Sequence, residues 1–183
     1  RQDIAEDYFR ENADEWDRLR SLYIMDAEVE EKIFSLVSGT PNQSIIDIGT
    51  GTGRMLELFG GIVERGVGID LSHEMLSLAR NRIDNAELHN CQVRHGNMYQ
   101  LPVDNEDFDF AILHLVLHYA DDPQAVIQEA ARVTVPGGRV VIVDFVPHEL
   151  EELRAAHAHR RLGFSDSEIR KFLISAGLTL SAI

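Results

Sequence analysis

Three glycines at alternate positions are the first residues in this sequence whose spacing indicates chemistry. Gly49, Gly51 and Gly53 follow an apolar run, and this spacing lets the main chain turn tightly and lie directly against a ligand. The loop is not a dinucleotide fingerprint, which would place its third glycine where the chain has Arg54. It also lacks the lysine of a phosphate-binding P-loop. The pattern therefore predicts a binding loop for a ligand other than a nucleotide phosphate.

Two carboxylates flank the glycine loop and narrow its chemistry. Asp47 stands two residues before Gly49, and Asp70 ends the next apolar run. An acid at Asp47 repels a pyrophosphate but suits an ammonium group. A carboxylate in the place of Asp70 accepts hydrogen bonds from ribose hydroxyls. S-adenosyl-L-methionine carries a ribose, an α-ammonium and a sulfonium without any phosphate, and we expect the loop and the two acids to bind it.

Strands and helices alternate from residue 44 onward and must position these groups. Apolar runs predict strands at 44–48, 67–70, 92–95, 109–117, 139–145 and 178–183. Helical periodicity and capping residues predict helices at 3–24, 26–38, 53–64, 73 onward after Ser72, 123 onward after Asp122, 148–160, and from the capping box Ser165–Glu168 to Gly177. This alternation indicates a doubly wound, mostly parallel α/β sheet, which binds ligands beyond the carboxyl ends of its strands.

Five motifs in order resemble those of class I S-adenosylmethionine-dependent methyltransferases. They are Ile45–Phe59, Val67–Ser72, Gly96–Met98 with Leu101-Pro102, Phe108-Asp109, and Pro136–Arg139. The resemblance covers roughly residues 3–183 and is greatest to the group that includes ubiquinone and menaquinone C-methyltransferases. It implies a Rossmann-like sheet and an enzyme that methylates a small molecule.

A narrower resemblance concerns three further segments, Asn12–Asp17, His118–Pro123 and His157–Asp166. They are similar to the methyltransferase half of bacterial proteins that carry an N-terminal ArsR-type winged helix. This implies a longer, regulator-like parent protein with sequence missing at both ends. We accordingly expect a helical cap at 1–40 over the active site and a cofactor-binding core at 41–183 whose C-terminal strand hairpin is incomplete. The competing hypothesis is a non-catalytic domain that senses S-adenosylmethionine or its demethylated product.

The resemblance also implies a set of cofactor-binding residues. Asp47 would orient the ammonium group, Asp70 would bind the ribose, and His114 would lie along the methionine moiety. Asn97 stands where the family usually has an aspartate, and its carbonyl oxygen would accept from the adenine amino group. Core packing remains an equal explanation for some of these residues. Leu71 and Met75 would lie on the two sides of the adenine, Met98 would use its main-chain N–H, and Trp16 would close over the cofactor. The full set is Asp47, Gly49, Thr50, Gly51, Asp70, Leu71, Met75, Asn97, Met98, His114 and Trp16.

No catalytic group can be assigned from the sequence. His118 and Tyr119 follow the predicted central strand towards the substrate mouth and are the candidates for a general base or a hydrogen-bond donor. A sulfonium is already an activated leaving group, so the absence of an obvious triad is no objection. We expect no metal, because His157 and His159 are flanked by arginines and Cys91 is the single cysteine.

Composition excludes several partners. The 17 Lys and Arg residues stand against 31 Asp and Glu residues, a formal net charge of −14. Such acidity argues against binding of nucleic acid or of an anionic membrane by this segment, although an absent N-terminal domain could bind DNA. With one cysteine and no apolar stretch long enough to span a membrane, we expect a cytoplasmic protein. The oligomeric state is left open between monomer and dimer.

Overall fold

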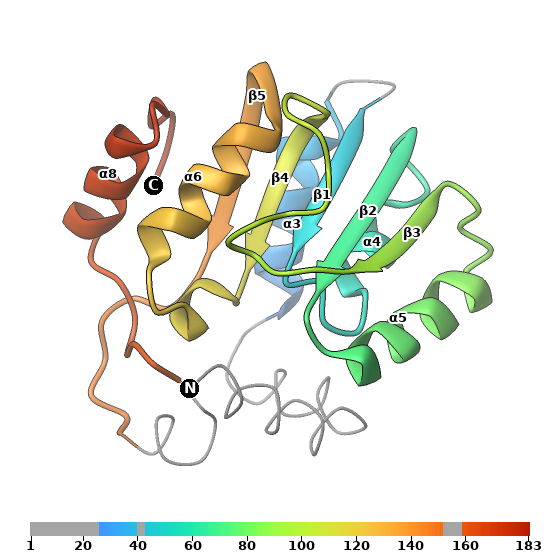
Figure 1. Ribbon diagram of the computed structural model, residues 1–183, viewed down its shortest axis with the longest axis horizontal. Coiled ribbons are helices and arrows are strands. Elements are labelled where there is room, and N and C mark those ends of the chain that lie inside the picture. The colour runs from blue at the N-terminus through green and yellow to red at the C-terminus, as the bar shows by residue number, and fades with distance from the viewer. Residues whose placement is uncertain (1–25, 40–42, 152–158) are drawn as a thin grey trace.

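A five-stranded parallel sheet forms the centre of the chain (Figure 1). The structure is a computed structural model that describes residues 26–39, 43–151 and 159–183. The strands are β1 (Ser44–Ile48), β2 (Arg65–Asp70), β3 (Cys91–His95), β4 (Phe108–His114) and β5 (Thr134–Val143). Their order is β3-β2-β1-β4-β5, and every pair is parallel. The chain therefore moves outward from β1 in one direction and resumes at β4 in the other, which creates a switch point between β1 and β4.

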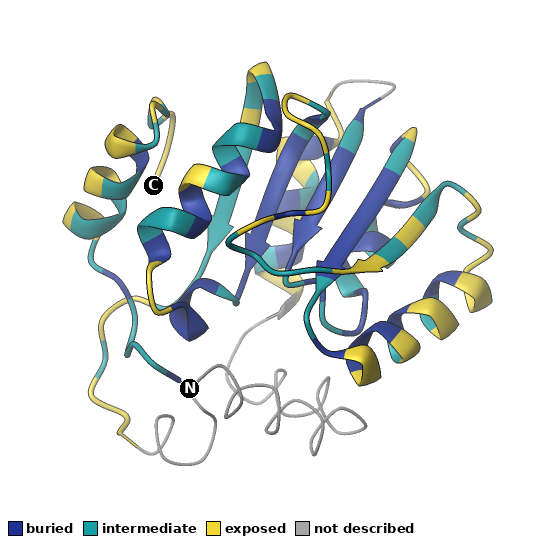
Figure 2. Cartoon of the chain, in the orientation of Figure 1, coloured by how far each residue is buried: buried dark blue, intermediate teal, exposed yellow. Residues whose placement is uncertain are grey.

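Helices cover both faces of this sheet. They are α3 (Asp26–Val37), α4 (Arg54–Phe59), α5 (His73–Asn85), α6 (Pro123–Val133) and α8 (Asp166–Ser175), with a short 3₁₀ turn η2 (Leu117–Tyr119) after β4. The central strands are buried while the outer faces of the helices are exposed (Figure 2). This arrangement confirms the predicted doubly wound α/β fold.

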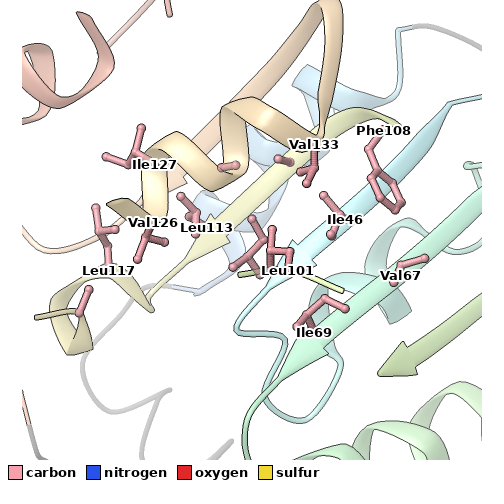
Figure 3. Close-up of a cluster of buried hydrophobic side chains, with 14 of the residues drawn as sticks. Ile46, Val67, Ile69, Leu101, Phe108, Leu113, Leu117, Val126, Ile127 and Val133 are labelled. Atoms are coloured by element: carbon pink, nitrogen blue, oxygen red, sulfur yellow. The ribbon is translucent and has the colours of Figure 1, made fainter. Parts of the chain in front are cut away.

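Successive side chains of each central strand point to opposite faces of the sheet, and they contribute to two separate hydrophobic cores. In β1, Ile46 and Ile48 face the core under α6 and α8, whereas Ile45 faces the core under α3 and α4. Figure 3 shows the first of these cores, in which Ile46, Val67 and Leu113 from three strands lie with side chains of α6. Because both faces are buried, the strands are nearly continuous apolar runs, and a polar residue within them needs a specific reason.

Capping chemistry fixes the helix starts that the sequence indicated. Ser72 accepts a hydrogen bond from the N–H of Met75 at 3.2 Å and starts α5, and Asp122 accepts from Ala125 at 3.1 Å to start α6. At α8 the capping box is complete, since Ser165 and Glu168 exchange side-chain to main-chain hydrogen bonds. The predicted helix at 26–38 is confirmed as α3, and that at 3–24 lies outside the described residues.

Several predicted elements or boundaries differ from the structure. The strand predicted at 139–145 is β5 at Thr134–Val143, so the residues 136–138 lie within the strand and do not form a turn before it. β4 ends at His114 instead of residue 117, because Leu115 takes a positive φ of 55° and the chain turns into η2. Helix α4 ends at Phe59, where a pair of glycines follows. Within 148–160 the described residues are not helical, since His148 donates to the carbonyl of Leu162 instead. Residues 178–183 form no strand, so the expected first arm of a C-terminal hairpin is not observed.

The capping box predicts a specific loss of stability in the variant Ser165→Ala. Removing the hydroxyl leaves the N–H of Glu168 without its side-chain partner, which should lower the free energy of unfolding by about 1 kcal/mol. Urea titration of the chain followed by circular dichroism measures this change. The control Ser35→Ala removes an exposed hydroxyl inside α3 and should leave stability unchanged or slightly raised. Equal losses in the two variants would contradict the capping role.

Candidate functional site

A large cavity opens at the carboxyl ends of the central strands, on both sides of the switch point. It encloses about 1130 Å³, including the space at its open mouth, which is enough for a nucleoside-sized ligand. Segments after β1, β2, β3 and β4 form its walls. All expected cofactor-binding residues within the described ranges line it: Asp47, Gly49, Thr50, Gly51, Asp70, Leu71, Met75, Asn97, Met98 and His114. Trp16 lies outside the described residues.

Backbone geometry explains the glycines of the loop. Gly49, Gly51 and Gly53 have φ angles of 75°, 53° and 81°, which side chains with a Cβ adopt only at a cost. A Cβ on Gly49 would in addition lie 2.3 Å from Cγ2 of Val116 on the opposite wall. On the next strand, a Cβ on Gly68 would lie 2.6 Å from Oγ1 of Thr50. The loop thus lies close against β2 and forms one wall of the cavity with bare main chain.

Asp70 lies at the end of β2 and connects three segments. Its Oδ2 accepts from the N–H of Gly51 at 2.8 Å, and its Oδ1 accepts from the N–H of Ser72 at 2.9 Å. Burial raises the pKa of this carboxyl above its ordinary value, while these hydrogen bonds act in the opposite direction. Each carboxylate oxygen has a further lone pair, so Asp70 can still accept from a ligand.

Asp47 introduces a second carboxylate into the floor of the cavity. It lies in β1 between Gly68 of β2 and Ile112 of β4, and its side chain is 2% exposed. Its neighbours in the strand belong to the apolar cores, so a carboxylate here needs a polar function. The two acids place negative charge on the inner wall, on both sides of the glycine loop.

Both arginines that line the cavity are already paired with carboxylates. Arg54 makes a two-pronged contact with Glu30 at 2.7 Å on each prong and a further one with Glu57 at 2.8 Å, and these partners raise its pKa. Arg160 forms an ion pair with Asp121 at the mouth. Asp47 and Asp70 therefore set the charge of the inner cavity. This donor and acceptor set fits a cationic nucleoside and does not fit a phosphate.

The two catalytic candidates occupy different positions. Tyr119 lines the cavity and is 8% exposed, whereas His118 does not line it. The side chain of His118 is 2% exposed, its Nδ1 lies 2.8 Å from Oδ1 of Asp144, and its main-chain N–H donates to Oδ2 of the same carboxylate at 3.2 Å. His118 thus lies behind the cavity wall, and the expectation that it faces the substrate mouth is not met.

The side chain of His118 packs against other aromatic rings, and its main-chain carbonyl contacts the segment that carries Arg160. The rings of Tyr119 and His159 each have their centroids 4.1 Å from that of His118. The carbonyl of His118 accepts from the N–H groups of Arg160 and Arg161 at 3.1 Å each. The buried pair of His118 and Asp144 therefore anchors Arg160, a residue of the cavity mouth.

Several residues of the cavity gave no usable signal in the sequence. Tyr99, Val116, Asp121 and Arg160 line it although the sequence analysis assigned no binding role to them. Arg160 in particular reaches the cavity from a segment far along the chain, so only the tertiary contact with His118 brings it there. Tyr99 uses its hydroxyl to accept from the N–H of Asp121 at 2.8 Å and so connects the two sides of the mouth.

Metal ligands do not gather among the described residues. No group of three or more His, Cys, Asp or Glu side chains within 26–39, 43–151 and 159–183 has a geometry that could hold a metal ion. Cys91 is half-buried at the start of β3, and burial raises the pKa of its thiol to about 11. Nor does any helix of the described part have the length and apolar character to cross a membrane.

The fold and the cavity together define a Rossmann-like nucleoside-binding domain, and comparison with known proteins gives the family. The family described as a methyltransferase domain matches residues 46–142, which is more than half of the chain. The chain therefore belongs to this methyltransferase domain family, and its family and fold imply S-adenosyl-L-methionine as the cofactor.

Individual relatives agree with this assignment at low identity. Demethylmenaquinone methyltransferase of Bacillus cereus (strain B4264) is 26% identical over 149 residues, which make up 79% of this chain and 63% of the relative. The chain thus spans less than two thirds of the length of that enzyme. Among solved structures, a SAM-dependent methyltransferase from Aquifex aeolicus has a TM-score of 0.72 at 20% identity, covering 91% of this chain and 89% of its own.

One structural neighbour shows that this fold also supports other chemistry. The [4+2]-cyclase SpnF has a TM-score of 0.72 at 22% identity, covering 82% of this chain and 56% of its own. At that identity the likeness concerns the fold alone. The activity of the present chain must therefore be argued from its cavity.

The buried pair of His118 and Asp144 predicts a large and specific loss of stability. Asp144→Ala leaves the buried imidazole Nδ1 and the main-chain N–H of His118 without their shared partner, so the free energy of unfolding should fall by about 1–3 kcal/mol. Asp121→Ala removes the carboxylate of an ion pair whose aspartate side chain is 60% exposed, and should cost at most about 1 kcal/mol. Chemical denaturation of both variants measures the difference. Similar losses would show that the buried pair has no special role.

Proposed function

We propose that this chain binds S-adenosyl-L-methionine in the cavity and that its active form transfers the methyl group to a small-molecule acceptor. The observation that carries the proposal is the pair of Asp47 and Asp70 beside bare glycine main chain, in a cavity whose arginines are neutralised. The ligand that matches these groups has a ribose, a positive charge and no phosphate. The name of the demethylmenaquinone methyltransferase relative supports a small organic acceptor.

Each residue has a distinct part in this proposal. When bound, S-adenosyl-L-methionine supplies a methyl group on a positively charged sulfur, which is an activated leaving group. Asp70 would accept from the ribose hydroxyls and hold the loop through Gly51. Asp47 would lie on the side of the ammonium group. Leu71 and Met75 would pack against the adenine, and the apolar wall that they form would exclude water.

Orientation is the main contribution that the protein would make to the reaction. Holding an acceptor in line with the methyl group is worth up to about 7–11 kcal/mol in favourable cases. Tyr119 lines the cavity and is the candidate to orient the acceptor or to exchange a proton with it. His114, which is the last residue of β4, is the candidate to lie along the methionine moiety of the cofactor.

A sensing domain without essential catalysis is the second candidate. It is favoured by the enclosed position of His118, which leaves Tyr119 and His114 as the titratable groups of the cavity wall beside β4. The two functions share the same cofactor site and differ in turnover. Incubation of the chain with methyl-labelled S-adenosylmethionine and a cell extract separates them, because the labelled small-molecule product forms only under the first.

The parent protein is also a matter of proposal. The similarity of the segments Asn12–Asp17, His118–Pro123 and His157–Asp166 to ArsR-type fusion proteins supports a cytoplasmic regulator in which another domain binds DNA. An antibody raised against this chain would then detect a protein heavier than 20.6 kDa in extracts of its source, and that protein would be retained on DNA. Size-exclusion chromatography of the same protein would decide between monomer and dimer.

Asp70→Asn should abolish most of the affinity for the cofactor product S-adenosylhomocysteine. The amide replaces one acceptor oxygen by a donor, so a charge-assisted contact to the ribose is lost and the affinity should fall at least about a hundredfold. Isothermal titration calorimetry measures it. Asp84→Asn, an exposed change on α5, removes the same charge and should bind as the unchanged chain does. Unaltered affinity in the Asp70 variant would refute the ribose assignment.

The raised pKa of Asp70 predicts a pH dependence with a definite sign. Ribose hydroxyls donate to the ionised carboxylate, so affinity should be full above the raised pKa and fall as the pH drops through it, before an ordinary aspartate is protonated. The free energy of unfolding of the chain without ligand depends on pH with the opposite sign. The unfolded chain ionises Asp70 at a lower pH than the folded chain does, so the free energy of unfolding declines as the pH rises through the raised pKa of the folded chain. Calorimetry with S-adenosylhomocysteine over a pH series tests this, and the Asp70→Asn variant should lack the step.

A further inference from the structure

Three side chains form a chain of contacts across the mouth of the cavity, which we call the strap: Tyr99, Asp121 and Arg160. The hydroxyl of Tyr99 accepts from the N–H of Asp121 at 2.8 Å and from that of Asp122 at 3.4 Å. The carboxylate of Asp121 in turn forms the ion pair with Arg160. All three residues of the strap line the cavity, so the strap is part of its rim.

The order of the strands shows what the strap spans. Tyr99 follows β3 and Asp121 follows β4, and both β2 and β1 lie between these two strands. Neighbouring strands are about 4.8 Å apart, so the ends of β3 and β4 are about 14 Å from each other. In Figure 1 the segment after β3 crosses in front of β2 and β1, and its Tyr99 reaches the segment after β4. The strap therefore extends across the two strands that lead into the glycine loop and Asp70.

Both ends of the strap are fixed by contacts of their own. Close to Tyr99, the N–H of Leu101 donates to the carboxylate of Glu129 in α6 at 2.9 Å, and the side chain of Leu101 is buried in the core. At the other end, the main-chain N–H of Arg160 donates to the carbonyl of His118 at 3.1 Å. The main chain at each end is therefore held in place independently of the strap.

The middle of the strap is exposed and weak. The side chain of Asp121 is 60% exposed, and an ion pair in such a place contributes little because water and salt screen it. The hydrogen bonds from Asp121 and Asp122 to Tyr99 also lie at the surface, where water competes for the same groups. A rim with fixed ends and a weak centre can open by movement of side chains while the fold stays intact.

We propose that the strap is a gate for the ligand of the cavity, so that breaking it speeds both entry and exit of the ligand. A ligand held by Asp47 and Asp70 in the inner cavity has to pass the rim. The opening of such a segment sets how fast a ligand is exchanged, and product release limits turnover in many enzymes. The inference rests on the proposed function, because it takes S-adenosylmethionine and its product S-adenosylhomocysteine as the ligands that pass. The strap would then regulate the release of the product after each methyl transfer.

Two variants break different contacts of the strap. Tyr99→Phe keeps the ring and removes the acceptor for the two N–H groups, and Asp121→Asn removes the negative charge that pairs with Arg160. Surface plasmon resonance on the immobilised chain measures the association and dissociation rate constants of S-adenosylhomocysteine. Since each variant removes a contact between protein groups, it should raise both rate constants at least about threefold and change the dissociation constant less than about twofold.

The matched control is Asp107→Asn, which removes the charge of an ion pair with Arg65 at the opposite, amino ends of the strands and should leave both rate constants unchanged. Association is the decisive quantity, because the loss of a direct contact with the ligand would raise the dissociation rate constant alone. Unchanged association in Asp121→Asn would overturn the proposal, and this exposed substitution provides the test even if Tyr99→Phe does not fold. Failure of the unchanged chain to bind S-adenosylhomocysteine would instead refute the proposed function.

Discussion

The carboxylate of Asp70 holds together the parts of the molecule that form the cavity. One oxygen binds the glycine loop through Gly51 and the other binds Ser72, the residue that starts α5. The end of β2, the loop after β1 and the residue that starts α5 thus share a single half-buried carboxylate. Burial alone would favour the neutral form of this acid, and the main-chain N–H groups oppose that tendency. The same side chain therefore shapes the loop and supplies the acceptor for a ligand.

The positive charges of the two arginines that line the cavity are neutralised by neighbouring carboxylates. Arg54, the first residue of α4, is held by two glutamates, and Arg160 at the mouth is held by Asp121. Behind the wall, His118 and Asp144 form a buried pair that supports the mouth through main-chain hydrogen bonds. A cavity built in this way favours a cation over a phosphate. The net charge of −14 is mostly a property of the surface, but two of the acids carry the chemistry of the site.

Local patterns predicted the elements well and their ends less well. The strands β1 and β2 and the capped helices α5, α6 and α8 have clear signals, because alternation, caps and glycines act within a few residues. The apolar run 109–117 reads as one strand, yet Leu115 turns out of the sheet while its N–H still bonds to Val143. The segment after β5 has helical periodicity, but its ends are held by His118 and Leu162. Such contacts between distant segments cannot be read from a local pattern.

The sequence by itself determined the parallel α/β order, the glycine loop and the two acids, because these depend on short-range spacing and on residue type. Only the tertiary structure decided which side chains share the cavity. It placed Tyr119 in the wall and His118 behind it, although they are adjacent in the chain. It also brought Arg160 to the mouth and fixed the amide of Asn97 with its oxygen towards Tyr99. Those outcomes depend on packing and hydrogen bonds between segments that are far apart in the chain or that turn back on themselves.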